Sequence, residues 1–133
     1  MPLFYNRTLG SQDLSYWDPM QWQADIVVVA LGSNDYSTEP YPSDEDFLSG
    51  YAALMAQISL DYPQAKLLLL CEPKTGGNEE VNVKTAARRA GAQYLRIPDS
   101  IYDAGTGCDN HPNAAGQQAI AAVVAPKVKE MLY

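Results

Sequence analysis

The stretch Asp25-Ile26-Val27-Val28-Val29-Ala30-Leu31-Gly32-Ser33-Asn34-Asp35 decides the fold of this chain. The continuous run of apolar, largely β-branched residues from Ile26 to Leu31 is typical of a strand buried on both faces of a sheet. Gly32 ends this run, and the polar residues after it are typical of a turn. The segment therefore predicts a buried strand with a polar loop at its carboxyl end.

Two later segments repeat this pattern of a short apolar strand, and each of them ends at a proline instead of a glycine. Lys66–Cys71 precedes Glu72-Pro73, and Gln93–Ile97, which is less apolar, precedes Pro98. Residues 1–24 show no sustained strand or helix period, so we expect a loop there, with a short helical turn at most.

Helical patterns separate the predicted strands. The first helix begins after a Ser43 cap and ends at Asp61-Tyr62-Pro63. Its apolar residues recur at helical spacing: Phe47, Tyr51, Leu54, Met55 and Ile58. A second helix is expected between an Asn78 cap and Gly91. A third begins near Asn113, and Pro126 either kinks or restarts it.

The alternating order of strands and helices predicts a parallel sheet covered by helices, a three-layer α/β/α domain spanning residues 1–133. An apolar share of 47% and a charged share of 19% are typical of one globular domain. Ligands of such sheets bind at the carboxyl ends of the strands. The site is therefore expected at Gly32–Asp35, at Glu72–Gly77, and between Pro98 and His111.

Charge and hydropathy exclude several partners. The net charge of −7 would repel nucleic acid and anionic lipid, and the longest apolar run is too short to cross a membrane. No basic and then apolar leader follows Met1, so we expect a soluble chain whose compartment stays open. Cys71 and Cys108 allow one disulfide bridge or two free thiols.

Two loops carry residues with chemical potential. His111, the single histidine, lies in the glycine-rich segment Gly105–Asn113, where it is either a general base or a residue that packs at a helix start. Asn34 follows the first strand, and its amide can donate to an oxyanion or simply stabilise a turn.

These two segments together resemble the third and fifth sequence blocks of the SGNH hydrolases, the GDSL-like esterases and lipases. The likeness is greatest to carbohydrate esterase family 2. The matching segments stand in the family's order and cover nearly the whole chain: Trp17-Asp18, Trp22–Asp25, Leu31–Asp35, Asp61–Pro63 and Gly107–Pro112. The resemblance implies a flavodoxin-like sheet topology and hydrolysis of acetyl or other short acyl esters, including those of sugars, without a cofactor or a metal.

The resemblance also implies roles for individual residues. His111 matches the family base, and Asn34, next to Gly32 in the same block, matches the oxyanion donor. Many SGNH enzymes have an aspartate three positions before the histidine, where this chain has Cys108. Either Asp109 or a backbone carbonyl is then expected to orient the imidazole.

The sequence departs from the family in lacking a Gly-Asp-Ser block, which holds the family nucleophile at the end of its first strand. The chain is therefore expected to be a truncated domain of about three core strands that lacks the family's first two. Ser33 beside Asn34 and Ser100 after Asp99 are the serine candidates for a replacement nucleophile, and Cys108 is a third candidate.

Other features are weaker. Trp17, Tyr36 and Tyr41 could stack on sugar rings near the strand exits, or could be ordinary half-buried aromatics. Cys108 and His111 alone fall short of a zinc site, and Pro73–Gly77 lacks the spacing of a phosphate-binding loop.

A truncated sheet would leave the strand Ile26–Leu31 at an open edge. We therefore expect association with a second copy through this edge, or a lead-in, residues 1–24, that folds over it. Two functional hypotheses follow: an SGNH-type esterase, which the paired motifs favour, and a non-catalytic remnant or carbohydrate-binding module.

Overall fold

A computed structural model describes residues 4–72 and 77–133. Its elements follow the predicted order, with three strands and three α-helices: β1 (Ile26–Ala30), α1 (Asp44–Asp61), β2 (Lys66–Cys71), α2 (Glu79–Arg89), β3 (Gln93–Arg96) and α3 (Ala114–Leu132). The 3-10 helix η2 (Pro19–Gln21) precedes β1, and two more, η3 (Asp99–Tyr102) and η4 (Cys108–Asn110), lie between β3 and α3. The α/β class and the strand and helix positions predicted from the sequence are confirmed.

The three strands form one parallel sheet in the order β1-β2-β3. Val29 of β1 pairs with Leu69 of β2, and Leu69 pairs with Tyr94 of β3. Because all three strands run in the same direction, their carboxyl ends meet at one edge of the sheet.

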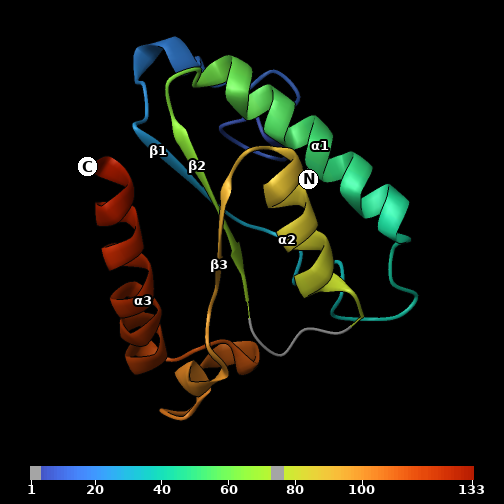
Figure 1. Ribbon diagram of the computed structural model, residues 1–133. Helices are drawn as coiled ribbons and strands as arrows, with labels where there is room; N and C mark the ends of the chain where they lie inside the picture. Colours follow the sequence, from blue (N-terminus) through green and yellow to red (C-terminus); the bar gives the residue numbers. More distant parts are fainter. Residues whose placement is uncertain (1–3, 73–76) are drawn as a thin grey trace.

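Helices cover both faces of the sheet, as the three-layer prediction requires (Figure 1). On one face, α1 and α2 pack on Val29, Leu69 and Cys71 in the larger buried cluster. On the other face, α3 places Met131 against Leu68 and Leu70. The middle strand therefore contributes side chains to both cores.

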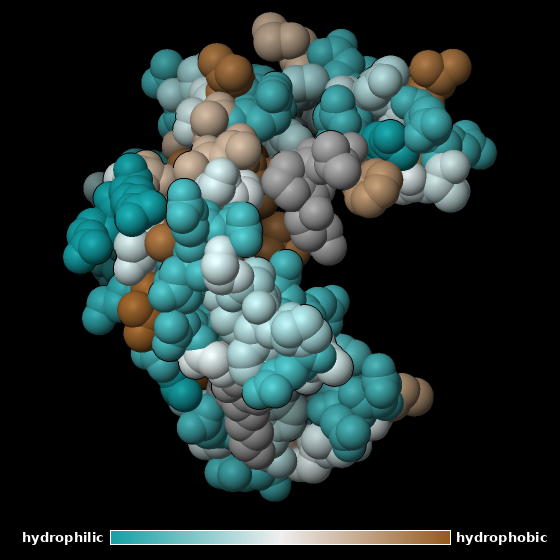
Figure 2. Space-filling view, turned by 90° about the vertical axis from the view of Figure 1, so that its right-hand side faces the viewer, coloured by the Kyte–Doolittle hydropathy of each residue, from teal (hydrophilic) through white to brown (hydrophobic). Residues whose placement is uncertain are grey.

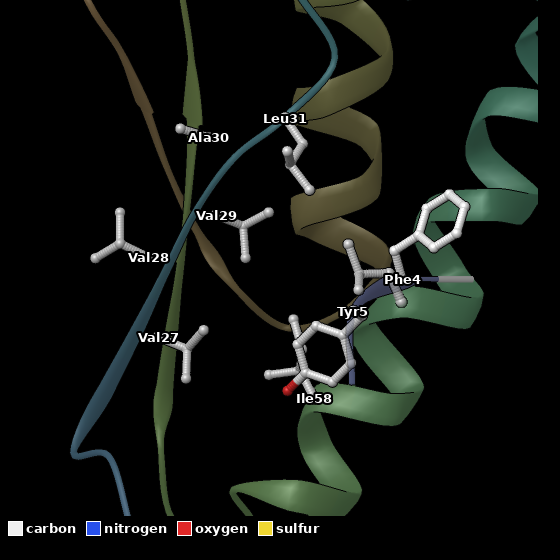
Figure 3. Close-up of a pocket in the computed structure, with 9 residues that line it drawn as sticks. Phe4, Tyr5, Val27, Val28, Val29, Ala30, Leu31 and Ile58 are labelled. Atoms are coloured by element: carbon white, nitrogen blue, oxygen red, sulfur yellow. The ribbon is translucent and has the colours of Figure 1, made fainter. Parts of the chain in front are cut away.

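β1 lies at the edge of the sheet, and among the described residues no further strand pairs with its outer side. Its odd-numbered residues, among them Val27 and Val29, face the side where Phe4, Tyr5 and Ile58 lie, and its even-numbered residues face the opposite side (Figure 3). The expectation of burial on both faces is wrong here, since 41% of Val28 is exposed. Helix α3 packs on β2 and leaves this part of β1 uncovered.

The space-filling view shows the molecule hollowed on one side, with hydrophobic residues at the floor of the hollow (Figure 2). Along β1, a cavity of about 340 Å³ opens between the strand, Phe4, Tyr5 and α1. The edge strand is therefore partly covered on its α1 face by residues of the amino-terminal segment.

Side-chain caps mark two of the predicted helix starts, and the third lacks the cap expected from the sequence. Ser43 Oγ accepts a hydrogen bond from the Asp46 amide at 3.1 Å at the start of α1. Asn78 stands before α2 without making a side-chain cap, and its amide instead donates to both carboxylate oxygens of Asp44 at 3.2 Å. Asn113 caps α3 by accepting from the Gly116 amide at 3.0 Å.

The segment before β1 is a loop that contains the short helix η2, as expected. Arg7 and Tyr16 form an isolated antiparallel bridge within it. No helix in the described part of the chain is long and apolar enough to cross a membrane. Cys71 is buried, Cys108 is exposed, and both thiols are free.

Leu69, which is fully buried at the centre of the sheet, is expected to dominate stability. Leu69→Ala should lower the free energy of unfolding by about 2–5 kcal/mol, because it leaves a cavity between β2 and the two helices. Leu60→Ala is the matched control, since 77% of Leu60 is exposed. Urea denaturation followed by circular dichroism measures both, and equal losses would contradict the assigned core.

Candidate functional site

The loops that carry the predicted site residues lie at the carboxyl edge of the sheet. The turn after β1 holds Gly32, Ser33 and Asn34, and the segment from η3 to α3 holds Ser100 and His111. Figure 1 shows both segments at the same end of the molecule. The second predicted exit is described only at Glu72 and Gly77, so the rest of the Glu72–Gly77 interpretation lies outside the described residues.

The turn after β1 needs a glycine at its first position. Gly32 has a φ of +129°, a conformation that disfavours any side chain. A Cβ at Gly32 would lie 3.1 Å from Phe47 Cζ and 3.2 Å from Glu79 Oε1. The Asp35 amide closes the turn on the Gly32 carbonyl at 3.0 Å. Asn34 lies exposed at this turn, as a donor to a bound substrate requires.

Two buried tyrosine hydroxyls hold this turn from either side. Tyr51 of α1 donates to the carbonyl of Leu31 at 2.6 Å, directly before Gly32. Tyr36, directly after the turn, accepts from Asn82 of α2 at 2.8 Å, and Asn82 also donates to Asp44 at 2.7 Å. Buried hydrogen bonds of this kind confine a loop to one geometry.

The electrostatic surroundings keep both hydroxyls protonated. Burial, the Glu79 carboxylate and other nearby acids raise the pKa of Tyr51. Burial is also the main cause that raises the pKa of Tyr36. The side-chain amides of Asn82 and Asn78 lower the pKa of Asp44, because they donate to its ionised form. At neutral pH, Tyr51 is therefore a donor and Asp44 an acceptor.

Sequence analysis did not identify Tyr51, Asn82 or Glu79 as residues that shape the site. Tyr51 and Asn82 both lie on the buried faces of their helices. Helical periodicity assigns Tyr51 to packing, and a polar residue such as Asn82 gives no hydropathic signal of burial. Glu79 is 1% exposed, although it stands in the first turn of α2, where an acidic residue is usually solvated. Its contact with the Gly32 turn follows from the tertiary fold.

The loop before α3 is tightly hydrogen-bonded around His111. The Gly107 amide donates to the His111 carbonyl at 2.8 Å, and the His111 amide donates to the Cys108 carbonyl at 3.1 Å. Asn113 donates from its side chain to the Ala104 carbonyl at 2.5 Å. The backbone that carries His111 is therefore restrained, while its side chain is exposed.

The imidazole contacts a backbone carbonyl. His111 Nδ1 lies 3.2 Å from the Cys108 oxygen. Since a carbonyl oxygen only accepts, this contact favours the tautomer with the proton on Nδ1, which leaves the Nε2 lone pair available as a base. Of the two expected orienting groups, the structure places a carbonyl at Nδ1. Asp109 lies beside it, exposed and with a φ of +52°.

The candidate nucleophiles occupy different settings. Ser33 is half-buried in the turn beside Asn34, whereas Ser100 is exposed in η3 and Cys108 is exposed in η4. No hydrogen bond between His111 and either serine is recorded among the described residues. The nucleophile therefore stays a prediction.

Of the three predicted aromatic platforms, Tyr36 and Tyr41 lie together beside the turn after β1, with their ring centroids 5.7 Å apart, whereas Trp17 does not lie there. Tyr36 is 2% exposed, so its ring cannot stack on a sugar. Trp17 lies instead beside Asp61 and Tyr62, at the end of α1 that precedes β2. A cavity of about 250 Å³ next to Gly32 and Asp35 is lined by Phe47 and other residues of α1 and its approach.

Metal-binding groups are absent from the described part of the chain. Within residues 4–72 and 77–133, no three His, Cys, Asp or Glu side chains are grouped to hold an ion.

Comparison with known proteins finds hydrolases whose sequences are similar to this chain. No protein-family model matches the chain. It is 25% identical over 126 residues to the cellulase/esterase CelE of Acetivibrio thermocellus, covering 87% of this chain and 15% of that protein. It is 22% identical over 137 residues to an acetylxylan esterase / glucomannan deacetylase of Cellvibrio japonicus, covering 99% of this chain and 38% of that protein.

Solved structures of esterases are similar to this chain as well. A family two carbohydrate esterase from Clostridium thermocellum, in complex with cellohexaose, superposes with a TM-score of 0.87 at 25% identity, over 98% of this chain and 42% of that one. GDSL-like lipases share the fold as well. The resemblance to SGNH hydrolases and to carbohydrate esterase family 2 is confirmed, and the chain spans less than half the length of these relatives.

The acid network beside the turn gives a pH-dependent prediction. Because the folded-state pKa of Asp44 is lowered, its contribution to stability is complete above its unfolded pKa of roughly 4 and is lost as the pH falls through the folded value. Asn82→Ala removes the first cause of the shift, so the pKa of Asp44 should rise toward its ordinary value. Carboxyl NMR titration measures it, with Asn110→Ala as the control. An unchanged pKa would contradict this assignment.

Proposed function

We propose that this chain carries an SGNH-type esterase site that hydrolyses acetyl or other short acyl esters of carbohydrates. One observation supports it most: the carboxyl edge of the sheet holds both a restrained turn that presents Asn34 and a restrained loop that presents His111 with Nδ1 on a carbonyl. The similar esterases of known structure and name give the reaction class.

The proposed chemistry proceeds through an acyl-enzyme. The Nε2 lone pair of His111 takes the proton of a serine hydroxyl as its oxygen bonds to the ester carbonyl carbon, and the carbonyl oxygen becomes negative. The Asn34 amide donates to that oxygen. Collapse breaks the bond to the sugar oxygen, which receives the proton from His111. Water then repeats the sequence and releases the acid.

Ser33 and Ser100 are the serines proposed for the nucleophile. Ser33 is adjacent to Asn34, so its hydroxyl and the oxyanion donor share one turn. Ser100 lies in η3, on the segment that continues to His111. Adduct mapping separates the two, because a phosphonofluoridate labels an activated serine and leaves an ordinary serine unmodified.

His111→Ala is expected to remove p-nitrophenyl acetate hydrolysis, since no other described histidine can take the serine proton. Asn34→Ala should lower kcat by about 10²–10³, the usual effect of losing one oxyanion donor. Gln118→Ala, at an exposed residue of α3, is the control for loss of an amide side chain. Mass spectrometry after phosphonofluoridate treatment should find one modified serine.

Equal turnover in the parent chain and in His111→Ala, with no modified serine, would contradict the proposed esterase site. Circular dichroism of each variant shows whether the fold is kept. We expect it to be kept, because His111 and Asn34 are both exposed and carry little packing.

We also propose that two copies of this chain associate through the open edge of β1. A two-fold axis would pair the two edge strands as antiparallel neighbours and continue the sheet. The strand also exposes apolar side chains, since Val28 is 41% exposed, and their burial would favour association through this edge.

Val28→Lys is expected to convert the dimer to a monomer, because a charged side chain on an edge strand opposes pairing. Size-exclusion chromatography with light scattering measures the mass, and Val81→Lys, at an exposed valine of α2, is the control. A parent chain that is monomeric at all concentrations would overturn this association.

A further inference from the structure

A second depression lies away from the candidate ester site. It has a volume of about 360 Å³ and lies between the amino-terminal segment and the end of α1, with Trp17, Asp61 and Tyr62 among the residues that line it. Asp61 and Tyr62 precede β2, so this depression lies at the amino ends of the strands. The candidate ester site lies at the opposite, carboxyl edge (Figure 1).

The lining combines aromatic rings with planar polar groups. Tyr5, Trp17 and Tyr62 supply rings, and Asn6, Arg7 and Asp61 supply amide, guanidinium and carboxylate groups. Trp17 is 42% exposed, so part of its indole is open to solvent. Aromatic faces suit the apolar C–H faces of pyranose rings, and paired donors and acceptors suit their hydroxyls.

The walls of this depression are held by the backbone and do not depend on flexible side chains alone. The Trp17 amide donates to the Asn6 carbonyl at 2.8 Å, and the Thr8 amide donates to the Ser15 carbonyl at 2.6 Å. Gln23 donates to the Asp61 carbonyl at 3.1 Å and so joins the amino-terminal segment to α1. A restrained site loses less conformational entropy on binding.

The polar side chains that line the depression have N–H and O–H groups that can donate to a ligand. Arg7 contacts Asp13 at 2.8 Å and the Gly10 carbonyl at 3.1 Å, and both recorded contacts use Nη1. Its guanidinium carries further N–H groups on Nε and Nη2. Burial, followed by the nearby Asp61 carboxylate, raises the pKa of Tyr5 to about 12, so its hydroxyl stays a donor at neutral pH.

The charge balance favours a neutral ligand. Arg7 and Asp61 place one positive and one negative group in the lining, and the chain as a whole has a net charge of −7. An anionic ligand would be repelled by the overall field, and a purely apolar ligand would make no use of the polar groups in the lining.

We propose that this depression is a second carbohydrate-binding site, in which Trp17 stacks on a neutral sugar ring while Arg7 and Asp61 bond to its hydroxyls. The site is separate from the proposed ester-cleaving residues and does no chemistry of its own. Its ligand is an unsubstituted stretch of a neutral polysaccharide. While this stretch is bound, another part of the same polysaccharide lies at Asn34 and His111, a pairing that rests on the proposed esterase function.

Titration of the ¹⁵N-labelled chain with cellohexaose, xylohexaose and mannohexaose tests this site. At least one oligosaccharide should shift the indole N–H signal of Trp17 and backbone signals at Asp61 and Tyr62. Trp17→Ala should weaken that binding at least tenfold, whereas Trp17→Phe, which keeps an aromatic face, should retain most of it. Trp22→Ala is the matched control, because Trp22 is 64% exposed and does not line the depression.

The outcomes separate this site from the proposed ester site. Shifts confined to the surroundings of Asn34 and His111, or no shifts with millimolar oligosaccharide, would overturn the second site. Trp17→Ala should leave hydrolysis of p-nitrophenyl acetate unchanged, since that substrate has no sugar to hold. Binding retained in His111→Ala would support the second site even if the esterase proposal fails.

Discussion

The pairing of β1 with β2 is the interaction on which the candidate site depends. β1 has hydrogen-bonded neighbours on one side only among the described residues, so its position comes from this single ladder and from the packing of Val29 against the α1 face. The turn that presents Asn34 begins directly after β1 ends. Any shift in the register of β1 by one residue would exchange its inner and outer side chains and would move this turn with them.

The ladder ends before the turn, so different interactions must shape Gly32–Asn34. Tyr51 reaches Leu31 from α1, and Asn82 reaches Tyr36 from α2. Helices that pack on one face of the sheet therefore also determine the geometry of its carboxyl edge. This arrangement links core stability to the site, because a change in the packing of α1 or α2 also moves a hydrogen bond beside the turn.

The sequence predicts the elements well because their causes are local. Apolar runs, a Ser43 cap and the glycine after α2, Gly91, act over a few residues. The two tyrosine contacts join residues 20 and 46 positions apart, and no local pattern predicts them. For the same reason Asn78 was expected to cap α2, whereas the fold brings Asp44 close enough to take its amide. Burial of Val28 was overestimated because hydropathy does not indicate which strand lies at an edge.

The spacing of the strands bears on whether Asn34 and His111 can act on one substrate. β1 and β3 are separated by β2, so their carboxyl ends lie about 10 Å apart, two steps of about 4.8 Å. An acyl-transfer site needs an oxyanion donor about 3 Å from the carbonyl oxygen and a base about 3 Å from the nucleophile, with the reacting carbon between them. These two distances sum to only about 6 Å, so the side chains of Asn34 and His111 would have to reach toward each other. A serine on either flanking segment, Ser33 or Ser100, would therefore have to direct its hydroxyl into the space between Asn34 and His111.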